Sequence, residues 1–292
     1  MGLLAGIFTA NGQTEIGFVS DTQAPMWAET IVLKANHNEK ATGKVFHDII
    51  KTKPSTLFIL GDVVNLSCKE KRWHNMDRYL DSCRQAGIPV SALLGNHDVM
   101  SNASKGESNF QRRFPDHNRT GYYKILDSTA FVFLNSNFKK LSPADFEAQQ
   151  QWYQSTLSSL DADPSVAVII VACHHAPYSN STIVGSSESV QKNFVPAYLK
   201  SRKAKLFITG HSHNFEHFSI QGKDFLVVGG GGGLHQPLSI KPDRLPDLDT
   251  TYKPQFHYLL MRRTRGSLQF TSRYLADDFS GFQDGKTFSI AY

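Results

Sequence analysis

The chain has 292 residues, of which 40% are hydrophobic and 20% are charged, and its formal net charge is +5. No apolar run approaches the roughly 18 residues of a membrane span, and three cysteines without a paired spacing imply no disulfide framework. The basic residues are scattered apart from two short clusters, KSRKAK at 200–205 and RRTR at 262–265. Nucleic acid is therefore an open but not a favoured partner, since it needs a continuous basic track. The sequence leaves the oligomeric state unknown.

The N-terminus carries the apolar stretch LLAGIFTA within residues 1–12. It resembles the hydrophobic part of a signal peptide, but the positive residues that normally precede that part are missing. Residues 1–12 are therefore either a truncated signal peptide, which would make the protein periplasmic or secreted, or a plain apolar N-terminus of a cytoplasmic protein.

Short apolar segments rich in β-branched residues recur along the chain and are typical of buried strands. In chain order they are EIGFVS (15–20), TLFILG (56–61), PVSALLG (89–95), AFVFLNS (130–136), VAVIIVA (166–172), KLFITG (205–210) and DFLVVGG (224–230). The last two segments, 256–263 and 267–275, flank TRGS and predict an antiparallel hairpin.

Three helical stretches alternate with these strands, at 29–53, 70–87 and 142–163. The second ends at Gly87, and the third begins with Ser142 as N-cap followed by Pro143. Alternating strands and helices predict an α/β layered fold. We find no repeat or linker that would divide the chain, so we expect one domain over 1–292, with a core at about 14–275 and a C-terminal tail at 276–292.

Polar residues follow five of the predicted strands. They are Asp21, Asp62, the run Asn96, His97 and Asp98, the pair His174 and His175, and the pair His211 and His213. Ligands of open α/β sheets gather outside the carboxyl ends of the strands. Carboxylate and amide oxygens mixed with imidazole suit two divalent or trivalent transition-metal ions such as Fe, Mn or Zn. An Asp shared between two ions would form a clamp for phosphoryl transfer.

These motifs, in this order, resemble those of the calcineurin-like metallophosphoesterase superfamily. The resemblance runs from residue 14 to about 275 through Gly61-Asp62, Gly95-Asn96-His97-Asp98 and Gly210-His211-Ser212-His213. Segments such as TGYYKI and HHAPYSNS are similar to the purple acid phosphatase-like branch. The resemblance implies a four-layer α/β/β/α sandwich of two mixed sheets flanked by helices.

The resemblance also assigns roles to these residues. Asp21 and His213 would bind the first metal, Asp62 would bridge both metals, and Asn96, His174 and His211 would bind the second. A hydroxide bridging the ions would attack phosphorus. His97 would contact the phosphoryl group and either protonate the leaving oxygen or stabilise charge, with Asp98 orienting its ring. Only one of His174 and His175 can point inward from an extended strand, so His175 is assigned as a neighbour of the site and a candidate substrate contact.

Two positions depart from the superfamily pattern. Gln23 replaces the histidine of the usual Asp-x-His motif, and Asn65 replaces the tyrosine of the GDxxY motif of purple acid phosphatases. Either amide would be a weaker, neutral ligand to the first metal, and Asn65 is also a candidate substrate contact. We expect the first site to be occupied but looser.

Two further features are candidate parts of the site rim. The glycine run 229–233 lacks the Lys-Ser/Thr of a phosphate-binding loop; we expect a tight loop there, with His235 as a candidate substrate contact. Arg112 and Arg113 are candidate phosphate contacts.

The sequence thus predicts a metal-dependent hydrolase of small phosphomonoesters or phosphodiesters. A nuclease of the same superfamily and a non-catalytic scaffold with a decayed first metal site stay open as alternatives.

Overall fold

The computed structural model describes residues 14–249 and 254–292, so residues 1–12, interpreted above as a truncated signal peptide or an apolar N-terminus, lie outside it. Within the described ranges, no helix combines the length and the apolar character needed to cross a bilayer. The strands are β1 (Glu15–Val19), β2 (Thr56–Ile59), β3 (Val90–Ala92), β4 (Tyr122–Leu126), β5 (Thr129–Phe133), β6 (Val168–Ala172), β7 (Ala204–Thr209), β8 (Phe215–Ile220), β9 (Lys223–Val228), β10 (His257–Thr264), β11 (Ser267–Leu275) and β12 (Phe282–Ala291). The α-helices are α1 (Asn38–Thr52), α2 (His74–Gln85), α3 (Ala103–Arg113), α4 (Pro143–Ala162), α5 (Glu188–Asn193) and α6 (Val195–Lys200), with 3-10 turns η1 (Glu29–Ile31), η2 (Glu70–Arg72) and η3 (Phe138–Lys140).

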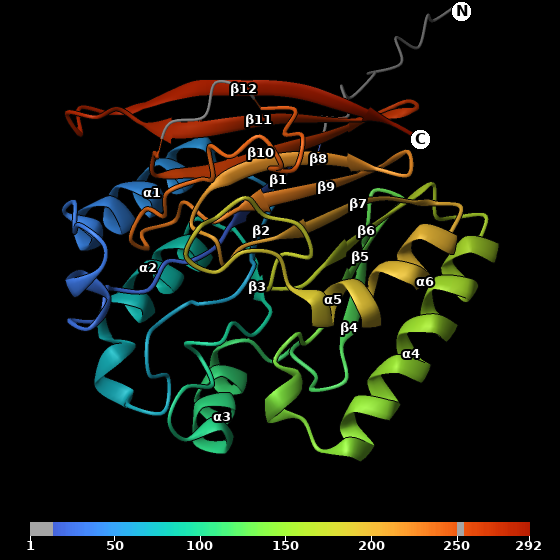
Figure 1. The fold of residues 1–292 in the computed structure, drawn as a ribbon, viewed down its shortest axis with the longest axis horizontal. Helices are drawn as coiled ribbons and strands as arrows, with labels where there is room; N and C mark the ends of the chain where they lie inside the picture. The colour runs from blue at the N-terminus through green and yellow to red at the C-terminus, as the bar shows by residue number, and fades with distance from the viewer. Residues whose placement is uncertain (1–13, 250–253) are drawn as a thin grey trace, which may run out of the picture.

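The strands form two mixed six-stranded sheets (Figure 1). The first has the order β12-β11-β10-β1-β2-β3, in which β1, β2 and β3 are parallel. The second has the order β4-β5-β6-β7-β9-β8, with a parallel centre of β5, β6, β7 and β9. The parallel strands of each sheet therefore deliver the loops that follow them to one edge.

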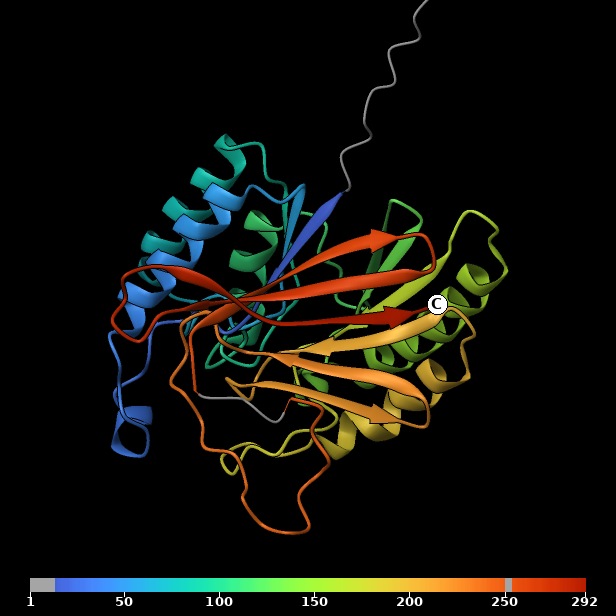
Figure 2. The same ribbon diagram turned by 90° about the horizontal axis from the view of Figure 1, so that it is seen from above.

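Alternating side chains of the strands divide the interior into three hydrophobic layers. In β2 and the residue after it, Leu57 and Ile59 pack on the helix side, whereas Phe58 and Leu60 pack between the sheets. Phe131 of β5 meets Phe58 in that central layer, with ring centroids 4.9 Å apart. Figure 2 shows α1 and α2 on one side of the paired sheets and α4 to α6 on the other. The predicted four-layer α/β/β/α sandwich is confirmed.

Several local predictions are confirmed by the backbone. The hairpin forms between β10 and β11, with Thr264 opposite Ser267. Helix α4 begins after Ser142, whose hydroxyl accepts a hydrogen bond from the Asp145 backbone N–H, and Pro143 is its first residue. Helix α2 stops before Gly87, which has a φ of +79°.

The helix predicted over 29–53 is wrong in its first part. Only the short turn η1 forms near Glu29, and α1 begins at Asn38, directly after His37 with a left-handed φ of 49°. Ile31 and Val32 are more than 70% exposed, so this stretch has no apolar face buried on the sheet to hold it in a helix. The helix predicted over 70–87 likewise starts late, at His74.

The C-terminal tail predicted over 276–292 is also wrong in its second half. That segment contains β12, which pairs antiparallel with β11 along its length and completes the first sheet. Its side chains are mostly exposed or half-buried, so it lacks the apolar run that revealed the inner strands. The strands β4 and β8, also at sheet edges, were not predicted either.

Candidate metal centre

The predicted site residues lie in the loops that follow the parallel strands. Four of them have left-handed backbone conformations: Asp21 (φ 59°), Asp62 (φ 50°), His211 (φ 71°) and His213 (φ 48°). Aspartate and histidine tolerate this region better than most residues, but it still costs free energy that the surrounding fold must supply. These sharp turns direct side chains from different strands toward one point.

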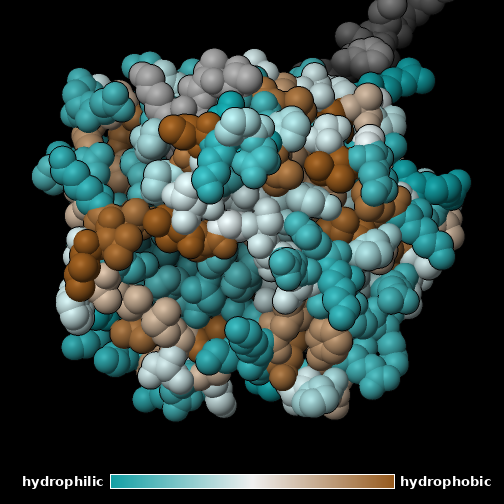
Figure 3. All heavy atoms as spheres, viewed as in Figure 1, coloured by the Kyte–Doolittle hydropathy of each residue, from teal (hydrophilic) through white to brown (hydrophobic). Residues whose placement is uncertain are grey.

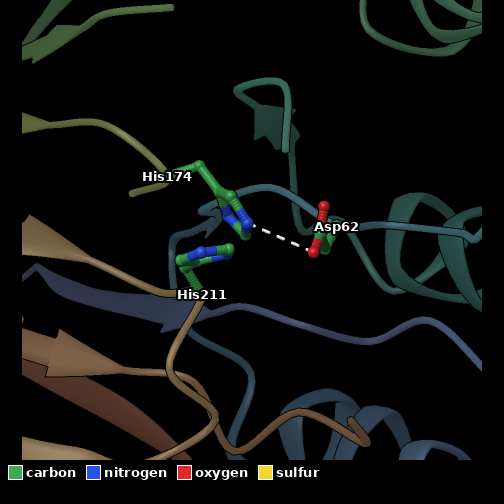
Figure 4. A group of neighbouring side chains, drawn as sticks. All are labelled: Asp62, His174 and His211. Carbon is green, nitrogen blue, oxygen red and sulfur yellow. Dashed lines mark ion pairs between the residues drawn. The ribbon is translucent and has the colours of Figure 1, made fainter. Parts of the chain in front are cut away.

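Two groups of potential metal ligands result, and they share one residue. Asp62, His174 and His211 place ligand atoms within 4.8 Å of one another, and so do Asp21, Asp62 and His213. Figure 4 shows the imidazoles of His174 and His211 directed toward the Asp62 carboxylate. Because Asp62 has two oxygens and belongs to both groups, it lies where a carboxylate bridging two ions would lie. The two groups contain Asp21, Asp62, His174, His211 and His213, the residues to which the resemblance assigned the two ions.

The hydrogen bonds of two histidines show which nitrogen faces the centre. Nδ1 of His174 lies 2.9 Å from the Leu60 carbonyl oxygen, and Nδ1 of His213 lies 2.7 Å from that of Leu234. Each Nδ1 must donate to its carbonyl, so in the neutral ring each Nε2 is left with a lone pair.

Apart from the Gln23 amide nitrogen, 3.4 Å from the His213 Nε2, those lone pairs face oxygen acceptors. The His174 Nε2 lies 3.2 Å from Asp62 Oδ2, and the His213 Nε2 lies 3.3 Å from Asp21 Oδ1. Both carboxylate oxygens are buried and accept no hydrogen bond of normal geometry from the described residues. Two acceptors this close require a cation between them, either a proton or a metal ion, so the residues fit the metal ions that the resemblance implies.

The pKa values of the cluster shift in opposite directions. Burial lowers the pKa of His174, but the adjacent Asp62 carboxylate outweighs it and raises that pKa to about 9. Burial raises the pKa of Asp62, but the charges of His174 and His97 lower it on balance. Burial together with His175 and His174 holds the pKa of His211 well below its usual range. Asp62 is thus held charged and His211 neutral, as metal ligands must be, whereas the adjacent carboxylates raise the pKa of His174 and His213, whose imidazoles a metal ion would have to deprotonate.

Asn96 lies beside the second group, with its Oδ1 3.2 Å from the His174 Nε2. The preceding residue has to be glycine, because a Cβ on Gly95 would lie only 2.0 Å from Asp62 Oδ1 and 2.2 Å from the Asp62 backbone nitrogen. The loops that carry Asp62 and Asn96 therefore touch at this point.

His97 lies at the centre, but its surroundings differ from the prediction. Its backbone N–H donates to Asp62 Oδ1 at 2.8 Å, and its Nε2 lies 3.9 Å from Asp62 Oδ2. The Glu29 carboxylate lies nearer to the ring, with Oε1 3.6 Å from Nε2. Sequence reasoning missed Glu29, because it placed that residue inside a helix.

The predicted role of Asp98 in orienting the His97 ring is wrong. The Asp98 carboxylate accepts backbone hydrogen bonds from Val63 (3.1 Å), Val64 (3.2 Å) and Gly95 (2.9 Å), and the His97 Nδ1 has no hydrogen-bond partner among the described residues. It is fully buried, and burial, together with Asp62, raises its pKa to about 7. Asp98 instead holds the loop after β2 against the loop after β3.

The structure brings Gln23 to the centre but not Asn65. Gln23 is buried, with its Nε2 3.4 Å from the His213 Nε2, and its Oε1 has no hydrogen-bond partner among the described residues. The Asn65 amide donates to the Ala24 carbonyl and lines a separate cavity beside Tyr79. Of the two amides, only Gln23 adjoins the first ligand group.

His175 lies closer to the centre than we expected from the alternation of side chains along an extended strand. Strand β6 ends at Ala172, so the alternation of an extended strand does not extend to His174 and His175. The His175 ring lies 4.4 Å from that of His211, and its Nδ1 bonds to the Ser136 hydroxyl at 2.8 Å. Burial and the neighbouring His174 lower its pKa to about 3.

His235 is half-buried, with its ring 4.3 Å from that of Phe256. The glycine run beside it forms the expected tight loop: a Cβ on Gly233 would lie 2.6 Å from the His213 ring.

Arg112 and Arg113 point away from the centre. Both pair with Glu70, at 2.7 and 2.6 Å, and Arg113 also pairs with Asp77. Their proposed contact with phosphate is therefore wrong.

A cavity of about 250 Å³ opens over the centre. Its polar lining comprises Glu29, Asp62, Asn96, His97, His211, His213 and Gln236. Gln236, a residue that the sequence did not single out, lies at hydrogen-bond distance from Ser181 of the neighbouring loop, at 2.6 Å.

Comparisons with known proteins agree with this architecture. The sequence model of the family described as calcineurin-like phosphoesterase matches residues 14–215. The chain therefore belongs to the calcineurin-like phosphoesterase family, whose members use divalent or trivalent metal ions. No curated protein is detectably similar to it in sequence.

Solved structures share the fold at low sequence identity. A purple acid phosphatase, PPD1, from yellow lupin (Lupinus luteus) seeds has a TM-score of 0.72 and 16% identity over 96% of this chain; the chain spans 54% of that protein's length. GAP50, the anchor in the inner membrane complex of Plasmodium, has a TM-score of 0.67 and 16% identity, over 96% of this chain and 89% of that one. A dimetal phosphatase from Danio rerio has a TM-score of 0.60 and 12% identity, over 96% of this chain and all of that one.

Proposed function

We propose that this protein hydrolyses phosphomonoesters or phosphodiesters at a dinuclear metal centre. The observation that carries the proposal is Asp62, a buried carboxylate shared by two groups of metal ligands. Asp21, Asp62 and His213 would hold the first ion, with the side-chain amide of Gln23 beside them. Asp62, Asn96, His174 and His211 would hold the second. When bound, two such ions supply charge neutralisation at the phosphoryl oxygens and a water molecule activated for attack.

The residues of the chain supply the remaining parts of the reaction. His97 lines the cavity beside Asp62, where its ring can contact the phosphoryl group and give a proton to the leaving oxygen. The hydrogen bonds from Nδ1 of His174 and His213 to backbone carbonyls hold both rings with Nε2 facing inward. Asp98 fixes the two loops that carry Asp62 and His97.

The test is metal content together with phosphoesterase activity. We expect close to two transition-metal ions per chain in untagged protein purified without chelators, and hydrolysis of 4-nitrophenyl phosphate or bis(4-nitrophenyl) phosphate. His174→Ala should lower kcat/KM by at least about 100-fold, since even changes behind metal ligands cost 10- to 100-fold. The matched control is His47→Ala, which alters an exposed histidine on α1 and should leave both readouts unchanged.

A non-catalytic scaffold is a second candidate, favoured by Gln23 in place of the usual histidine and by the occurrence of this fold in an anchor protein. One metal or none per chain, not restored by added Mn, Fe or Zn, would support it and refute the catalytic proposal.

A further inference from the structure

The part of the cavity beyond the metal ligands is apolar. Val32 and Leu33 line it from the segment before α1, and Ile183 and Val184 line it from the segment before α5. Among the described residues, no lysine or arginine lines this cavity. The charged side chain beside Val32 and Leu33 in the lining is the acidic Glu29. The walls therefore offer contact to an apolar group and no partner for a second anionic one.

The same apolar surface continues outward from the cavity. Val32 is 72% exposed and Ile183 is 43% exposed, and Trp27 and Ile31, in the same segment as Val32, are 78% and 71% exposed. Figure 3 shows hydrophobic residues along one side of this face, bordering a hollow of hydrophilic ones. Large apolar side chains gathered beside a polar hollow mark a binding site more often than chance exposure.

Hydrogen bonds hold these walls in place without a ligand. The Ser181 hydroxyl accepts from the backbone N–H groups of Ile183 and Val184 and donates to Gln236. The Thr182 N–H donates to the Pro237 carbonyl at 2.9 Å. On the other wall, the Glu29 carboxylate accepts from the Met26 N–H at 2.6 Å. Preformed apolar walls bind a ligand without the entropic cost of ordering loops.

We propose that the substrate is a phosphoester with an apolar, uncharged organic group, an alkyl chain or an aryl ring, that packs between the walls formed by Val32, Leu33, Ile183 and Val184. This inference rests on the proposed phosphoesterase activity and names its substrate class. The oxygen of water bonds to phosphorus, the P–O bond to one alcohol breaks, and the departing alkoxide takes up one proton, which replaces the proton that water loses.

The experiment uses methyl, propyl, butyl and hexyl 4-nitrophenyl phosphates, which all release the same 4-nitrophenolate. We expect kcat/KM to rise about three- to fourfold for each added methylene until the cavity is filled, because each buried methylene contributes about 0.8 kcal/mol. Alkylphosphonates, which are not hydrolysed, should show the same order as inhibitors, with butylphosphonate binding more tightly than methylphosphonate.

Two variants test whether the apolar walls cause the dependence of kcat/KM on chain length. Ile183→Ser should flatten the dependence on chain length. The control Ile125→Ser removes an isoleucine of similar exposure, 40%, from β4. Ile125 pairs with Ala130 near the start of β5, at the end of the sheet away from the metal centre, so this variant should keep the full dependence.

The outcomes separate the two proposals. A rise with chain length that is lost in Ile183→Ser and kept in Ile125→Ser supports the inference. A flat or falling series, or an equal rise in Ile183→Ser, overturns the inference but leaves the phosphoesterase intact. Failure of the metal-loaded protein to hydrolyse any ester overturns the proposed function and the inference with it.

Discussion

The contact between Gly95 and Asp62 makes Gly95→Ala a sharp test of how the centre is built. The added Cβ would lie 2.0 Å from Asp62 Oδ1 and 2.2 Å from the Asp62 backbone nitrogen. Normal contacts are 3.4 Å or more, so Asp62 or the Gly95 loop has to move by roughly 1 Å. Because one of the two atoms belongs to the backbone, a change of side-chain rotamer cannot relieve the clash.

The expected effects follow from that displacement. Overpacking of a buried site costs about 1–3 kcal/mol, which for a chain of this size lowers the melting temperature by roughly 2–10 °C. A shift of about 1 Å at the reacting centre lowers kcat by about 100-fold. Since Asp62 belongs to both ligand groups, both ions should be held less tightly.

The assay combines thermal unfolding in chelator, metal content by elemental analysis and kcat toward a 4-nitrophenyl ester. Gly281→Ala is the matched control, because its added Cβ would meet nothing within 4 Å and should leave all three readouts unchanged. If Gly95→Ala retains two ions and kcat within about twofold of the unaltered protein, the role assigned to this contact is refuted.

Three other changes test separate parts of the structure. Gln23→His should slow the loss of metal to a competing chelator, because imidazole binds transition metals more strongly than an amide oxygen does. An unchanged or faster loss of metal would exclude Gln23 from the first site. Glu29→Gln should raise the ratio of kcat/KM for a dianionic monoester to kcat/KM for a monoanionic diester by about fivefold. The reason is that it removes a negative charge whose repulsion is worth about 1 kcal/mol near the phosphoryl site. An unchanged ratio would contradict this. Burial raises the pKa of Glu216 to about 7, so the ionised form is disfavoured in the folded state and stability should fall as pH rises from about 4.5 to 7. Chemical denaturation of Glu216→Gln should show a weaker fall, by a few kcal/mol, and an identical pH dependence in both proteins would refute the assignment.

The inner strands and the candidate metal ligands at their ends could be predicted from the amino-acid sequence. Buried parallel strands need continuous apolar runs, and the polar residues after those runs are forced to one edge of each sheet. Asp62, Asn96, His174, His211 and His213 could therefore be predicted together. Edge strands such as β12 could not, because half-exposed strands carry no such run.

Which residues from different loops meet at the centre could not be predicted, because it depends on how the chain packs in three dimensions. Glu29 reaches His97 from a segment that failed to form a helix, whereas Asp98, next to His97 in the chain, turns its carboxylate to backbone amides. Gln23 and Asn65 were equal candidates by sequence, yet only Gln23 adjoins His213. The backbone N–H groups of Ile183 and Val184 donate to the Ser181 hydroxyl, and these bonds hold the two residues at the cavity. Such contacts depend on loop geometry between distant segments, which local sequence patterns do not encode.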